Sequence, residues 1–196
     1  PSLVGSEMCI RDSTWSKDKD GRDWIAVSCE GEGARIWWPN KDHITAEGDS
    51  VRMSYTVPSH LMAVGNGKLI SVTDLGDKTT YEWFVRNPIN NYNISVQIGN
   101  YVAVQDTFFK DNVTHFMNHY VLDYNQELAS NYFTQSKEII RFYEKYFGDY
   151  QWYEDGYKLI EVPYLGMEHQ SAVTYGNGFS IYNGVRSKSW PMYGVI

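Results

Sequence analysis

The sequence predicts a mixed fold in which a β-rich part comes first and a helix with a small sheet (α+β) follows. Residues 50–57 alternate strictly between apolar and polar side chains, which is the pattern of a half-buried strand. Residues 125–148 instead repeat apolar side chains at steps of three, four and seven, which is the pattern of an amphipathic helix. The period changes near residue 122, and we therefore expect a domain boundary there.

Short strands joined by Gly, Asn and Asp turns are typical of an antiparallel sandwich or saddle. Asn66 and Gly67 lie between two such strands and form a strong hairpin signal. We expect strands in the β-rich part at residues 23–29, 50–57, 61–64, 69–73, 80–87, 93–108 and 114–124.

The predicted helix has signals at both of its ends. Asp123 and Gln126 are spaced to form a capping box at its start, and Gly148 is placed to end it. Strand character returns after the helix, at residues 157–164, 171–176 and 179–184.

Three segments follow from this reading. Residues 1–13 show neither a helical nor a strand period, so we interpret them as a non-native leader. Residues 14–122 form the β-rich domain, incomplete at its start, and residues 123–196 begin a second domain. Both ends of the sequence look cut, and we expect the chain to be a piece of a longer protein.

Composition and charge narrow the class of protein. Hydrophobic residues make up 42% and charged residues 21%, which is typical of a globular chain rather than a disordered one. The formal net charge of -7 argues against a nucleic-acid partner. No apolar run approaches the roughly 20 residues that span a bilayer, so we expect no transmembrane segment. Compartment and oligomeric state stay open.

The residues that commonly bind metals do not form a recognisable site. Cys9 and Cys29 form neither a CxxC pair nor a disulfide framework. His115 and His119 have HxxxH spacing, but their segment has strand character. Residues four apart on a strand lie roughly 13 Å apart, too far to share an ion. We therefore expect these to be polar or half-buried strand histidines.

One acidic residue lies in a suggestive place. Glu168 follows Gly166 and Met167 in the stretch "GMEHQ". An extended segment can pair with a peptide as an added strand, and a carboxylate at its end can hold the peptide's α-ammonium group. Such a charge-assisted hydrogen bond contributes roughly 1.5–3 kcal/mol. From these residues alone, an ordinary surface glutamate remains the simpler interpretation.

The chain resembles the aminopeptidase N-like zinc metallopeptidases, the gluzincin group that includes leukotriene hydrolase. Three stretches carry the resemblance, and they follow the family's order and separation. They are "ARIWWPNKDH" with "VRMSYTVPSHLMAVGNGKL", then "FYEKYFGDYQWYEDGYKLIEVP", and last "LGMEHQSAVTYGN", which is similar to the family's G-x-M-E-N motif.

The resemblance implies that residues 123–196 are the truncated start of a thermolysin-like catalytic domain. It also implies that Glu168 binds the free amino group of a peptide substrate. The other residues implied to contact the substrate are Gly166, Met167, His169 and Gln170.

The family's HExxH helix and third zinc ligand would follow Ile196. The resemblance therefore implies a zinc aminopeptidase as the parent protein, with no catalytic or metal-binding residue inside this chain. We expect the chain alone to bind no catalytic zinc and to be inactive.

Four positions depart from the family pattern: Leu165 stands for Gly, His169 for Asn, Asn40 for Cys and Ser28 for a Gln that helps hold the amino terminus. These departures bear on the details of amine anchoring and on side-chain preference, but not on the carboxylate itself.

Two alternatives are open. One is a non-catalytic, family-like interaction scaffold, which an intact HExxH in the parent protein would rule out. The other is a carbohydrate-binding β-sandwich that stacks sugars on Trp37 and Trp38, although packing of these rings against the core is the simpler interpretation.

Overall fold

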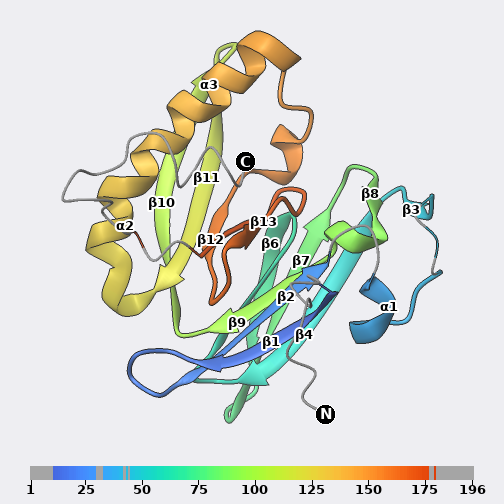
Figure 1. Ribbon diagram of the computed structural model, residues 1–196, viewed down its shortest axis with the longest axis vertical. Helices are drawn as coiled ribbons and strands as arrows, with labels where there is room; N and C mark the ends of the chain where they lie inside the picture. Colours follow the sequence, from blue (N-terminus) through green and yellow to red (C-terminus); the bar gives the residue numbers. More distant parts are fainter. Residues whose placement is uncertain (1–10, 30–32, 42, 44, 177–178, 180–196) are drawn as a thin grey trace, which may run out of the picture.

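The computed structural model describes residues 11–29, 33–41, 43, 45–176 and 179 (Figure 1). Figure 1 shows helices α2 and α3 together with strands β10 to β13 in the upper part of the view, and most earlier strands in the lower part. The described residues form several sheets and few helices, so the prediction of a β-rich mixed fold is confirmed.

A four-stranded antiparallel sheet lies in the first half of the chain, in the order β1-β2-β9-β5. Its first strand begins inside the segment interpreted as a leader, and residues 11–13 pair with β2. The strands are β1 (Arg11–Lys17), β2 (Asp23–Cys29), β9 (Val96–Gly99) and β5 (Met62–Gly65).

A three-stranded antiparallel sheet has the order β4-β7-β6. The alternation predicted for residues 50–57 is confirmed, because Met53 and Val57 are buried, Tyr55 is half-buried, and Ser54 and Thr56 are exposed. The remaining elements of this part are short. The bounds are β4 (Val51–Pro58), β7 (Lys78–Val85), β6 (Lys68–Asp74), β3 (Glu47–Gly48), β8 (Ile89–Asn90), α1 (Ala34–Trp37) and η1 (Asn91–Asn93).

A mixed five-stranded sheet has the order β10-β11-β12-β14-β13. β11 runs parallel to β12, and β12 runs parallel to β14, whereas the two outer pairs are antiparallel. The sheet therefore continues across the predicted boundary at residue 122, which coincides with the end of β11. Its strands are β10 (Tyr101–Lys110), β11 (Val113–Leu122), β12 (Leu159–Glu161), β14 (Val173–Tyr175) and β13 (Gly166–Met167).

The predicted helix at residues 125–148 is interrupted. It consists of η2 (Asp123–Asn125), α2 (Gln126–Tyr132), η3 (Phe133–Gln135) and α3 (Ser136–Phe147). At the interruption, the hydroxyls of Thr134 and Ser136 donate to main-chain carbonyls three residues earlier, which favours a tight turn. None of the helices in the described part of the chain is long and apolar enough to cross a membrane.

The two helix-end signals had different outcomes. Gly148 ends α3 with a φ of 92°, as predicted. The capping box was wrong, because α2 has no side-chain cap and Asp123 lies in the 3-10 turn before it. The Asp123 carboxylate instead accepts hydrogen bonds from Arg22 and from the Tyr124 amide.

The hairpin predicted at Asn66-Gly67 was also wrong. The strands on its two sides belong to different sheets, since β5 pairs with β9 and β6 pairs with β7. Asn66-Gly67 is therefore a corner between two sheets. Gly67 has a φ of 73°, and a Cβ atom there would lie 2.0 Å from the Phe84 carbonyl oxygen, so only glycine fits.

The core has three connected parts. The helices pack on β10 and β11 through Phe108, Met117, Phe133 and Ile139, all of which are at most 2% exposed. A second cluster surrounds Trp83 and joins the three-stranded sheet to the five-stranded one. The third fills the space beside β2 and β5. Because the clusters span the sheets, they fix the five-stranded sheet against the earlier strands. The predicted strand at residues 179–184 lies, except for Phe179, outside the described residues.

Candidate functional site

The "GMEHQ" stretch lies at one edge of the five-stranded sheet. Gly166 and Met167 form β13, which pairs with β14 and is the last strand in the sheet order. No strand among the described residues pairs with its other edge. An unpaired edge of this kind can accept an extended peptide as an additional strand.

The backbone of this edge is held in an unusual conformation. Gly166 has a φ of 145°, which residues with a side chain rarely adopt. Met167 is 3% exposed, so its side chain anchors the strand in the protein interior. The side chain of Met167 therefore fixes β13 in place, and the outer edge of this strand has no partner among the described residues.

Glu168 is exposed, directly after β13. Its carboxylate makes no hydrogen bond or ion pair with any other described residue. It borders a cavity of about 350 Å³ between this loop and the end of α3. The cavity lining is mainly apolar and includes the aromatic residues Tyr143, Phe147, Tyr150, Trp152 and Tyr157. The site thus combines an open carboxylate with an apolar wall.

His169, the next residue, is fully buried. Its Nε2 atom accepts a hydrogen bond from the Cys29 amide at the end of β2, at 3.4 Å, and its Nδ1 atom has no partner among the described residues. Burial lowers the pKa of His169 to about 4, so the ring is neutral at pH 7. His169 therefore joins the loop to β2.

Gln170 is held by the first half of the chain. Its side-chain amide donates to the Pro88 carbonyl at 3.0 Å, and its main-chain amide donates to Asn93 Oδ1 at 2.9 Å. Its carbonyl accepts from Asn66 Nδ2 at 2.7 Å. These contacts occupy both the main chain and the side chain of Gln170.

Three further residues from outside the loop also hold it, and no sequence motif connects them with it. Gly67 donates its amide to Ser171 Oγ at 2.8 Å, and Lys158 Nζ donates to the carbonyls of Gly67 and Ser171 at 2.6 and 2.9 Å. Asn66, which is fully buried, also donates to Asn93. Asn66 and Gly67 lie about a hundred positions from the loop, so no local pattern could have linked them to it.

The HxxxH pair lies on β11, as expected for strand residues. His119 is fully buried, and its Nδ1 atom accepts a hydrogen bond from the Leu159 amide at 3.0 Å. His115 is half-buried and stacks on Tyr153. In the described parts of the chain, no three His, Cys, Asp or Glu side chains come together as a metal site requires. The described residues therefore do not provide a set of ligands that fits a zinc ion.

The two adjacent tryptophans are half-buried and pack against the core clusters. Their ring centroids are 6.3 Å apart and their planes are tilted by 59°. This arrangement agrees with the packing interpretation of Trp37 and Trp38.

No model of a protein family matches this chain, and no curated protein matches it. Solved structures do match. An M1 zinc metallopeptidase mutant from Deinococcus radiodurans bound to a Tyr-Ser-Ala substrate is 19% identical, with a TM-score of 0.69, and the match covers 88% of this chain and 39% of that one. A two-domain M1 zinc metallopeptidase mutant bound to L-arginine is 18% identical, with a TM-score of 0.68, covering 89% and 40%.

A third structure, an M1 zinc metallopeptidase from Deinococcus radiodurans, is 17% identical with a TM-score of 0.64. The chain spans between 35% and 40% of the length of these structures. At this identity the likeness concerns the fold. The chain therefore has the fold of part of an M1 zinc metallopeptidase, which agrees with the family resemblance at that level.

Proposed function

We propose that this chain is the amine-anchoring part of a longer zinc aminopeptidase, which removes residues from the amino termini of peptides. The observation that carries the proposal is the exposed carboxylate of Glu168 at the end of β13, whose outer edge has no partner strand among the described residues. The fold likeness to M1 zinc metallopeptidases supports it, and so does the share of those structures that the chain spans.

In this proposal the edge strand aligns the substrate and the carboxylate stops it. The backbone of Gly166 and Met167 pairs with an extended peptide, and Glu168 accepts hydrogen bonds from its α-ammonium group. The apolar wall beside Glu168 reduces competition from water and strengthens that contact. His169 and Gln170 contribute by holding the loop on which Glu168 lies.

A zinc ion in the parent enzyme would supply a polarised water for peptide hydrolysis. Because the described residues do not fit a zinc ion, we propose that its ligands lie outside them, in the HExxH helix and third glutamate that the resemblance implies after Ile196. The role of this chain is then to bind and orient the peptide.

The first test is the coding sequence beyond Ile196. An HExxH motif in frame, with a glutamate further on, is the expected result. A reading frame that continues without these ligands would contradict the proposed enzymatic activity. It would instead favour a non-catalytic scaffold with the same fold.

The second test is Glu168→Gln in the longer enzyme, assayed with an aminoacyl anilide. Loss of a charge-assisted hydrogen bond worth roughly 1.5–3 kcal/mol raises KM by about 10- to 100-fold. The matched control is Glu127→Gln, which changes an exposed glutamate on α2. An unchanged KM in Glu168→Gln would contradict the proposed role of this carboxylate.

A further inference from the structure

We propose that Lys158 and Ser171 form a clamp that positions Glu168 for the substrate amine. This inference rests on the proposed function, because it assigns residues that act on the amine-anchoring carboxylate without touching the substrate. It concerns the turn between β13 and β14, which carries Glu168 at its start and Ser171 near its end.

The turn has a conformation that needs support. Ser171 has a φ of 57°, which is uncommon for a residue with a side chain. The Ala172 amide donates to the His169 carbonyl at 2.9 Å and closes the turn. A non-glycine residue persists in this region only where its surroundings hold it there.

The support comes from buried contacts on one side of the turn. Ser171 is 2% exposed, and its carbonyl accepts from Lys158 Nζ while its hydroxyl accepts from the Gly67 amide. Lys158 is 4% exposed and also donates to the Gly67 carbonyl. Three separate segments of the chain therefore meet at this amine, and the turn cannot shift without breaking a buried hydrogen bond.

The amine of Lys158 can form both bonds in either protonation state. Burial lowers the pKa of Lys158 to about 7, although the nearby Asp155 carboxylate acts in the opposite direction. A neutral amine has two N–H groups and an ammonium group has three, and the two carbonyls need only two. Both hydrogen bonds of the clamp therefore persist above and below neutral pH.

Removing the clamp should affect the amine contact more than the fold. Lys158→Met keeps most of the length of the side chain, but it leaves two carbonyls without their donor and removes the amine that lies over the Trp83 ring. The turn is then free to move, and displacements of about 1 Å can reduce rates up to about a hundredfold.

The experiment is a double-mutant cycle in the full-length enzyme. We expect Lys158→Met to raise KM for an aminoacyl anilide about tenfold in the wild-type background and to have little further effect in Glu168→Gln. If Lys158→Met changes KM equally in both backgrounds, the clamp proposal is contradicted, because the effect of Lys158 would then not depend on Glu168. The control, Lys68→Met, changes the exposed lysine beside Gly67.

Ser171→Ala provides a second variant that removes only the hydroxyl contact, so the cycle can be completed even if Lys158→Met fails to fold. In the full-length enzyme, we also expect Ser171→Ala to speed hydrogen exchange at the Gly67 amide about tenfold, because that amide loses its acceptor, the Ser171 hydroxyl.

The two proposals fail in different ways. An unchanged KM in Glu168→Gln would remove the proposed function. A raised KM in Glu168→Gln, with Lys158→Met and Ser171→Ala behaving like Lys68→Met, would remove the clamp alone.

Discussion

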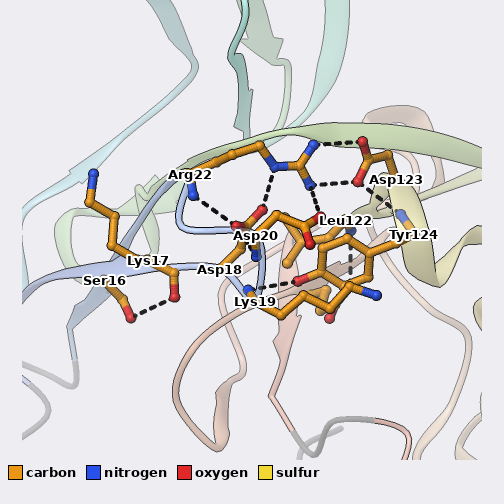
Figure 2. Close-up of polar contacts among 10 residues, drawn as sticks. Ser16, Lys17, Asp18, Lys19, Asp20, Arg22, Leu122, Asp123 and Tyr124 are labelled. Carbon is orange, nitrogen blue, oxygen red and sulfur yellow. Dashed lines mark hydrogen bonds and ion pairs between the residues drawn. The ribbon is translucent and has the colours of Figure 1, made fainter.

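The guanidinium of Arg22 and the carboxylate of Asp123 form a two-pronged ion pair, with N–O distances of 2.7 and 2.6 Å (Figure 2). Arg22 lies in the turn between β1 and β2, and Asp123 is the first residue after β11. The same guanidinium donates from Nε to Asp18 at 2.7 Å. The network joins the first strands of the chain to the start of the helices.

Arg22→Lys tests this network. A lysine cannot donate to Asp18 and to both oxygens of Asp123, so we expect a loss in the free energy of unfolding. The pair is partly exposed and screened by water, which limits the loss to about 1 kcal/mol. Urea unfolding at low and high salt measures it, and the loss should shrink in high salt.

The pH dependence of that loss has a definite sign. Hydrogen bonds from Arg22 lower the pKa of Asp123 from its usual value, so its stabilising contribution is full above pH 3.8 and is lost as pH falls through the folded-state pKa. Arg22→Lys and the wild type should therefore converge in stability at acid pH. The control Lys17→Arg alters an exposed pair with Asp23, and a loss as large as that of Arg22→Lys would contradict the special role of Arg22.

Gly67→Ala should be strongly destabilising. Its Cβ atom would lie 2.0 Å from the Phe84 carbonyl oxygen, and the backbone has a positive φ. We expect a loss of about 3 kcal/mol or more in the free energy of unfolding, measured by urea titration.

Gly76→Ala is the matched control, because it has a φ of 92° and nothing within 4 Å of the added Cβ atom. It should cost only about 1 kcal/mol of conformational strain. Equal losses in the two variants would show that close approach at the corner is unimportant.

Acid should destabilise the chain through its buried histidines. Burial lowers the pKa of His119 and His169 to about 4, whereas the unfolded value is near 6.5. The unfolded state therefore binds more protons between these values, so stability is full above pH 6.5 and is lost as pH falls towards 4. The charges that act on His119 are Asp106 and Lys137, and both effects are smaller than that of burial.

Urea unfolding at pH 7, 5.5 and 4.5 measures this slope, which should become shallower in His119→Gln. His60→Gln, which replaces an exposed histidine, is the control. An NMR titration that finds His119 charged at pH 6 would contradict the prediction.

Patterns within short segments predicted much of the fold. The alternation at residues 50–57 and the apolar period after residue 125 depend on which faces of a segment are apolar. The structure buries Met53 and Val57 of the strand and Tyr132 and Ile139 of the helices, whereas Leu128 and Tyr146 of the predicted helix face are exposed. Gly148 ends its helix by adopting a positive φ. This end was predictable because the conformation depends on the residue itself and not on distant segments. The placement of Glu168 after a short extended segment was predictable for the same reason.

Pairing between distant segments was not predictable in this way. Asn66-Gly67 has the local chemistry of a hairpin turn, but β5 pairs with β9 and β6 pairs with β7, and neither partner strand is next to the turn in the sequence. Asp123 has the local chemistry of a helix cap. Its carboxylate instead accepts hydrogen bonds from Arg22, which is far away in the sequence.

The sequence by itself therefore determined most types of element and the helix end at Gly148, because these depend on neighbours along the chain, whereas the family resemblance singled out Glu168. Only the tertiary structure decided that Glu168 follows the last strand in the order of the described sheet, and that Asn66, Gly67 and Lys158 hold its loop. These contacts depend on how the sheets pack, which brings together hydrogen-bonding groups from distant parts of the chain.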